Sequence, residues 1–197
     1  MPRTKEQNQK ILDARKQDII NCAISLLAYN NYNEVSIDEI ASKLKMSHGL
    51  FYHYFKNKID LISTILVYAE KNVLASLGED LINLEGEELL YTFFDRFITT
   101  CKNKETSNLI KLIINLVKSN YNHNKLKLGL ENLQKFYNSI LEKSVHLLSA
   151  EEKLLHPVEI STKLISLMIN GIILLATENR IKDSPLKAEH LVKSIIK

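Results

Sequence analysis

The 197-residue chain has few of the residues that interrupt regular structure, with five glycines and three prolines, and few that could cross-link it, with two cysteines. It has no tryptophan. Glycine and proline mark turns most strongly, so their scarcity and the absence of strand-like alternation predict an all-α fold. Cys22 and Cys101 lie far apart and neither belongs to a C-x-x-C pair, which argues against a disulfide framework and against a zinc cluster. Reduced cysteines of this kind are typical of a cytoplasmic protein.

Targeting and membrane signals are also missing. The opening residues, MPRTKEQNQK, contain no apolar stretch followed by a small-residue cleavage site, so export is not expected. The longest uncharged apolar run, Leu164 to Thr177, is shorter than the roughly 20 residues that span a bilayer. We interpret this run as a buried helix and predict a cytoplasmic protein with no membrane contact.

Motifs of catalysis are not found either. The chain has no glycine-rich phosphate loop, no H-E-x-x-H and no nucleophile motif. His48 and His53 do not have the i, i+4 spacing of a helical metal pair. The chain is therefore not expected to be an enzyme, to bind a metal or to need a cofactor.

Apolar residues recur at helical spacing along most of the chain. The first stripe follows the i, i+3, i+4 pattern of a helix that buries one face, and it consists of Ile19, Cys22, Ala23, Leu26 and Leu27. Asn30 and Asn31 follow it and are candidates for the left-handed conformation that often ends a helix.

Two short helices joined by a tight turn are predicted next. Ser36 and Glu39 have the spacing of a capping box. Lys45 and Met46 form the turn, and Ser47 can cap a helix that runs to His53 or Tyr54. This arrangement is typical of a helix-turn-helix, whose second helix enters the DNA major groove. The spacing alone is not specific, because any small helical hairpin shows it.

The residues of the second short helix favour DNA binding. Phe51 and Phe55 are one helical turn apart and can anchor the helix in a core. Tyr52 and His53 then face outward, where hydroxyl and imidazole groups can bond phosphates or base edges. The alternative is that these aromatic residues belong to a core, but a helix this short would then be apolar all round; for Tyr54 both interpretations stay open.

The same region is the most uniformly basic part of the chain. Four lysines and no acidic residue occur between Lys43 and Lys58. Asn57 can cap a following helix, with Asp60 at its third position. Lys56 and Lys58 flank that cap, so their charge and the amide end of the helix are expected to act on one phosphate.

The stretch from Ile19 to Leu66, "IINCAISLLAYNNYNEVSIDEIASKLKMSHGLFYHYFKNKIDLISTIL", resembles the DNA-binding domain of TetR-family transcriptional regulators. The similar features are the region of Tyr32, "SIDEIA", "MSHGLFYHYF" and "KNKIDL". The resemblance implies an N-terminal three-helix helix-turn-helix domain at residues 1–60 and a larger helical effector-binding and dimerisation domain at residues 61–197. It implies a ligand-responsive repressor that binds a palindromic operator in double-stranded DNA as a homodimer.

Carried over residue by residue, the resemblance implies a DNA-binding surface. Its members are Ser36, Ser47, His48, Gly49, Leu50, Tyr52, His53, Tyr54, Lys56 and Lys58. Three positions depart from the family pattern. Lys45 replaces the usual glycine of the turn, which costs about 1 kcal/mol if the position is left-handed. Leu50 replaces a small or hydroxyl residue, and Ile59 replaces a common acidic residue.

Longer helices are expected beyond this region, at about 57–76, 87–101, 107–119 and 125–147, and Ser149 with Glu152 forms a second capping box. Pro157 and Pro185 open two closing helices. The resemblance implies that these two pair with their copies in a four-helix bundle; an ordinary monomeric core is the alternative. Their apolar stripes are Val158, Ser161, Ile165, Met168, Ile172 and Leu175, with Gly171 beside them, and Ala188, Leu191, Val192, Ile195 and Ile196.

The helix near residue 95 is rich in aromatic residues, and a cavity there would offer few buried charges, so an apolar or amphipathic small-molecule effector is expected. Candidate pocket residues are Phe93, Phe97, Cys101, Leu112, Leu116, Phe136 and Met168. The alternative is that they form an ordinary core. For the whole chain, the alternative function is a non-transcriptional helical adaptor with the same fold.

Overall fold

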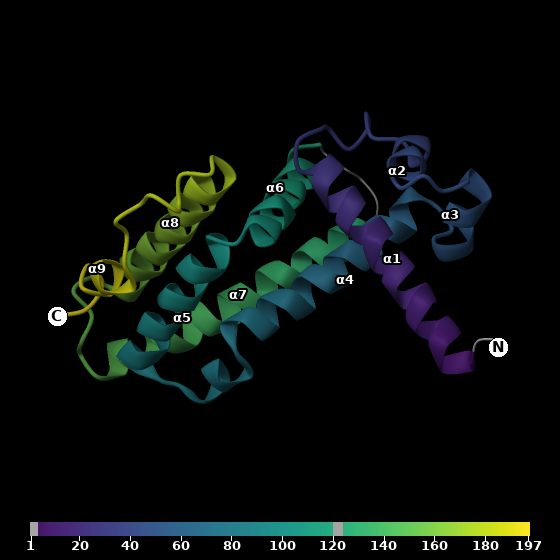
Figure 1. Cartoon of the computed structure of the whole chain (residues 1–197). Helices are drawn as coiled ribbons and strands as arrows, with labels where there is room; N and C mark the ends of the chain where they lie inside the picture. Colours follow the sequence, from purple (N-terminus) through teal and green to yellow (C-terminus); the bar gives the residue numbers. More distant parts are fainter. Residues whose placement is uncertain (1–3, 120–123) are drawn as a thin grey trace. The chain divides into compact units, whose positions relative to one another are not determined.

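The computed structural model of the chain describes residues 4–119 and 124–197, and within α4, η1 and α7 it leaves out some side chains. Those residues form nine α-helices and one 3₁₀ helix, η1 (Figure 1). The elements are α1 Lys5–Leu27, α2 Ile37–Lys43, α3 His48–Tyr54, α4 Lys58–Leu77, η1 Glu79–Asn83, α5 Gly86–Cys101, α6 Lys104–Lys118, α7 Asn124–Ala150, α8 Val158–Thr177 and α9 Ala188–Val192. Over the described ranges the one β feature is an isolated antiparallel bridge between Leu154 and Ile196, so the all-α prediction is confirmed.

The chain forms two compact units. One holds Met1–Tyr68 and Lys111–Gly129, and the other holds Ala69–Ile110 and Leu130–Lys197. Helices α4, α6 and α7 contribute residues to both units. The domain boundary expected at residue 60 stays a prediction.

The core of the first unit forms where the apolar faces of α1 to α4 meet. Its fully buried side chains include Ile19, Ala23, Leu27, Ile40, Phe51, Phe55, Leu61, Ile62 and Ile65. All of them lie on helical faces except Phe55, which is the C-cap of α3. Burying a leucine, isoleucine or phenylalanine side chain contributes about 1.5–3 kcal/mol. These contacts fix α3 from one side and leave its other side to solvent.

The end of α1 differs from the prediction. Ala28 caps the helix in the right-handed region, and neither Asn30 nor Asn31 has a positive φ, so the expected left-handed end is wrong. Side-chain amides serve the last carbonyls instead: Asn30 Nδ2 donates to the Leu26 carbonyl at 2.8 Å, and Asn115 Nδ2 donates to the Leu27 carbonyl at 3.1 Å. With those carbonyls satisfied, no left-handed residue is needed.

The turn between α2 and α3 is strained at Lys45, whose φ is 52°. This confirms that a left-handed residue without the freedom of glycine stands there.

Lys45→Gly is therefore expected to raise the free energy of unfolding by about 1 kcal/mol, measured as the denaturant midpoint at constant slope. Asn179→Gly is the control: its φ is 59°, but asparagine tolerates this region, so a smaller gain is expected. A lowered midpoint for Lys45→Gly would contradict the prediction.

The second unit has a separate core built from α5, α7, α8 and α9. It includes Phe93, Phe94, Cys101, Val145, Leu148, Ile165, Ile172, Ala176, Val192 and Ile195. The connection from α4 to α5 is held by Arg96, whose guanidinium bonds the Asp80 carboxylate at 2.7 and 2.8 Å and also the Leu77 carbonyl. Gly78 there has a φ of 85°, and a Cβ at this position would lie 2.1 Å from the Arg96 guanidinium. A side chain at residue 78 would therefore be strained by the backbone conformation and would displace the Arg96 guanidinium.

The ends of α7 and α9 correct two predictions. Helix α7 continues to Ala150, so Ser149 lies in its last turn and caps no helix; Glu152 follows with a φ of 53°. Helix α9 has only five residues and packs against α5, and its apolar side chains are buried inside the unit. The last apolar stripe, from Ala188 to Ile196, is therefore buried within one subunit and is not exposed for pairing with a second copy.

Candidate nucleic-acid interface

The two helices of the helix-turn-helix begin at the predicted caps. The Ser36 hydroxyl accepts a hydrogen bond from the Glu39 amide at 3.0 Å, and α2 starts one residue after the cap. The Ser47 hydroxyl accepts from the Leu50 amide at 3.2 Å, and α3 starts at His48. Both serines thus satisfy an amide that would otherwise lack a partner.

Helix α3 has one buried and one exposed face. Phe51 and Phe55 are buried with ring centroids 5.9 Å apart, as the spacing predicts. The exposed face carries His48, Gly49, Leu50, Tyr52 and His53, and Tyr54 is half-buried at its edge. The outward orientation of Tyr52 and His53 is therefore confirmed, whereas their contact with DNA stays a prediction.

The exposed side chains are held in place by their neighbours. The ring of His48 meets the ring of Tyr52 edge-on, with centroids 5.0 Å apart and planes at 88°. His53 and Tyr54 form a similar pair at 5.3 Å. A Cβ built on Gly49 meets nothing within 4 Å, so the backbone of the first turn is open to a ligand. Aromatic edges and an accessible backbone suit a nucleic-acid surface.

The next helix begins at a second set of local bonds. The Asp60 amide donates to the Asn57 side-chain oxygen at 2.9 Å, and the Asp60 carboxylate accepts from the Lys56 amide at 3.0 Å. The Lys56 side chain is exposed beside this cap. Lys56 is thus placed where a cation and a helix N-terminus can act on one anion.

Lys58 lies differently from the prediction. Its ammonium donates to the carbonyls of Tyr32 and Val35 and lies 3.9 Å from the centre of the Tyr32 ring. Burial lowers the pKa of the Lys58 ammonium, and the Glu39 carboxylate opposes that shift. An ammonium engaged in this way fastens α4 to the loop before α2, in contrast to the phosphate contact expected from the sequence.

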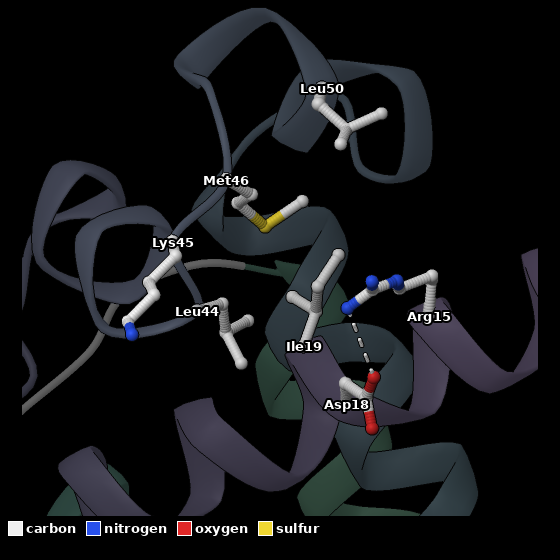
Figure 2. A pocket seen from close by; sticks show the side chains of 7 residues that line it. All are labelled: Arg15, Asp18, Ile19, Leu44, Lys45, Met46 and Leu50. Atoms are coloured by element: carbon white, nitrogen blue, oxygen red, sulfur yellow. Dashed lines mark ion pairs between the residues drawn. The ribbon is translucent and has the colours of Figure 1, made fainter.

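A small cavity lies next to the turn and under α3. Its volume is about 100 Å³, and its walls are Arg15, Asp18, Ile19, Leu44, Lys45, Met46 and Leu50 (Figure 2). Arg15 and Asp18 form an ion pair at 3.7 Å on its α1 side. Leu50 lines the cavity and is also exposed. Leu50 therefore borders both the cavity and the exposed face of α3.

The candidate effector residues fall into separate places. Phe93, Phe97 and Cys101 are buried in the core of the second unit, where the two phenyl rings stack at 5.7 Å, and Met168 packs against that core. Burial raises the pKa of the Cys101 thiol to about 12, so it stays protonated and apolar.

Leu112 and Leu116 are buried too, but they belong to the part of α6 assigned to the first unit. The side chain of Phe136 lies outside the described residues. A single pocket formed by all seven residues stays a prediction.

Helix α8 carries an apolar surface that the sequence analysis missed. Ile160, Leu167 and Leu174, seven residues apart, are exposed, and Leu167 is 66% exposed. We call these three the α8 stripe. Gly171 lies beside it, and a Cβ built there meets nothing within 4 Å. The interpretation of this run as a buried helix holds for the opposite face alone, because the helix is apolar on both sides.

The expectation that the run is too short to cross a membrane is also corrected. Helix α8 has 20 residues and is apolar enough by length and composition to do so. One such helix is weak support for a membrane protein, because core helices of soluble proteins pass the same test.

These features define the class. A capped helix pair, a tight turn and a second helix with an anchored apolar face and an exposed polar-aromatic face form a helix-turn-helix DNA-binding domain. Residues 19–65 match the family described as bacterial regulatory proteins, tetR family. This region of the chain is therefore similar to the DNA-binding domain of TetR-family transcriptional regulators.

Individual relatives agree with this assignment. The chain is 41% identical over 59 residues to the transposon Tn10 TetC protein of Escherichia coli, a match that covers 30% of each chain. The match therefore spans less than a third of that relative.

Solved structures extend the likeness to the fold of the whole chain. The ketosteroid transcriptional regulator KstR2 of Mycobacterium tuberculosis has a TM-score of 0.75 at 14% identity, covering 93% of this chain and 95% of that one. AibR, in complex with isovaleryl coenzyme A and operator DNA, has a TM-score of 0.71 at 17% identity, covering 91% and 94%. At such identities the likeness shows the fold alone, an N-terminal helix-turn-helix followed by a larger helical part.

Proposed function

We propose that the protein is a cytoplasmic, ligand-responsive transcriptional repressor that binds a palindromic operator as a homodimer. The observation that carries the proposal is the exposed face of α3, held from behind by Phe51 and Phe55. Tyr52, His48 and His53 would contact bases or phosphates, and Leu50 would contact a thymine methyl. Contacts to the phosphate backbone would come from Ser36, Ser47, Gly49, Tyr54 and Lys56.

Dimerisation follows from the geometry of the operator. Two recognition helices must reach successive major-groove faces about 34–36 Å apart, so a palindrome requires two subunits. The α8 stripe supports this, because three exposed apolar residues at heptad spacing form a seam that a second copy can cover. Gly171 beside the seam leaves room for a helix to approach closely. We place the interface on α8 because the apolar residues of α9 are already buried.

The proposed effector is a small apolar or amphipathic molecule. The aromatic core of α5 supports this chemistry, and the neighbour AibR was solved with isovaleryl coenzyme A and operator DNA. An effector that binds better to a form with separated recognition helices would shift the population away from DNA. The size of that shift is limited by its preference between the two forms.

The test of the DNA surface is Tyr52→Ala, assayed on duplexes that the parent protein selects from a random library. Loss of a base contact is expected to lower the affinity for the selected duplexes about tenfold to a hundredfold. The affinity for random duplexes should change little. Tyr91→Ala is the matched control, since Tyr91 is 47% exposed and Tyr52 is 45% exposed, yet Tyr91 lies on α5. Affinity is measured by fluorescence anisotropy at several salt concentrations.

Two outcomes would overturn the proposal. Parent-like binding by Tyr52→Ala would show that α3 does not read the operator. A parent protein that binds no duplex, including the DNA flanking its own gene, would favour the helical adaptor.

A further inference from the structure

A carboxylate lies beside the first residue of the recognition helix, at the edge of a basic region. Asp38, in the first turn of α2, places Oδ1 2.9 Å from Nε2 of His48. Both side chains are exposed. A carboxylate at a surface that faces phosphates repels them, and an exposed pair of this kind adds at most about 1 kcal/mol of stability. A gain in DNA affinity or in folding stability therefore does not explain why Asp38 contacts His48.

We propose that Asp38 is a positioning residue that fixes the tautomer of His48 and thereby the base edges that α3 accepts. The inference rests on the proposed function and names a determinant of specificity within it. A carboxylate can only accept, so Nε2 of His48 must be the ring nitrogen that carries the hydrogen. In a neutral imidazole the other nitrogen, Nδ1, is then an acceptor.

Nδ1 is the ring nitrogen of His48 that is left to accept a hydrogen bond from DNA. Over the described ranges, its ring has contacts to Asp38 and Tyr52 and no hydrogen bond at Nδ1. An acceptor at this position matches the amino groups of adenine or cytosine in the major groove. It disfavours the N7 and O6 acceptors of guanine. Asp38 would thus select between base pairs without touching DNA.

The ring is also held against rotation. Tyr52, one turn along α3, meets it edge-on at 5.0 Å and 88°, while Asp38 holds Nε2. Because the His48 ring is already fixed in the free protein, less side-chain entropy is lost when it binds DNA. The pair therefore presents one hydrogen-bonding pattern from the start.

The experiment compares base preference in the full-length chain, with random-library selection as the probe. Asp38→Asn is expected to lower discrimination about fivefold to tenfold at the positions where His48→Ala also lowers it. In the His48→Ala background, Asp38→Asn should change base preference no further. Glu39→Gln is the matched control, because it removes the same charge from the same helical turn. It should strengthen binding to random duplexes as Asp38→Asn does and leave base preference unchanged.

A spectroscopic readout separates positioning from a structural role. At pH 8, where an ordinary imidazole is neutral, the ¹⁵N resonances of His48 should report the Nε2–H tautomer in the parent. They should report a mixture in Asp38→Asn and the parent pattern again in Asp38→Glu. If the parent selects no sequence, the proposed function fails. If it does, but Asp38→Asn and Glu39→Gln have the same base preference or the tautomer is unchanged, this inference alone fails.

Discussion

Leu167→Glu is expected to convert the proposed dimer to a monomer and to weaken operator binding about a hundredfold or more. Leu167 lies in the middle of the α8 stripe and is mostly exposed in a single subunit. In a dimer a glutamate there would be buried without a partner, which costs several kcal/mol. A monomer presents one recognition helix, so it loses the second half-site and the gain from binding both together.

Sedimentation velocity and operator titration on the same sample measure the two parts of this prediction. Ile82→Glu is the matched control, because Ile82 is 67% exposed and Leu167 is 66% exposed, while Ile82 lies in η1. The control should remain dimeric and bind like the parent. A dimeric Leu167→Glu with parent-like affinity would move the interface away from α8, and dissociation of both variants would mean that any surface charge disrupts the assembly.

The parts of the DNA-binding region that the sequence predicts are local. A cap and the amide that it accepts from lie three residues apart, so Ser36, Ser47 and Asn57 could be assigned by spacing. The two faces of α3 follow from the one-turn spacing of Phe51 and Phe55. In each case, the partners are fixed by the geometry of one helix.

The features that the sequence could not predict depend on partners far along the chain. The Asn115 amide serves carbonyls 87 and 88 residues away, which removes the need for a left-handed residue at Asn30 or Asn31. The capping spacing at Ser149 is misleading because α7 continues through it. The exposed α8 stripe was missed because a helix that is apolar all round does not show which side its own core covers.

The other large effect is expected at Lys58. Lys58→Met keeps the aliphatic part of the side chain and removes the ammonium, so the carbonyls of Tyr32 and Val35 lose a charged donor and the Tyr32 ring loses its cation. Hydrogen bonds to charged groups are worth about 1.5–3 kcal/mol each, so we expect a loss of about 2–4 kcal/mol in the free energy of unfolding. The stability of the first unit should fall, as measured by chemical denaturation.

The salt dependence of DNA binding distinguishes this role from a phosphate contact. The affinity falls with salt, and each phosphate that a lysine neutralises adds about 0.9 to the steepness of log K against log salt. Lys56, exposed beside the cap of α4, is the matched control. Lys56→Met should reduce the steepness by about 1 while stability stays near the parent value. Lys58→Met should leave the slope unchanged at temperatures where the protein remains folded. The reverse pattern, a less steep slope with parent-like stability for Lys58→Met, would show that the ammonium binds a phosphate and contributes little to holding the loop before α2.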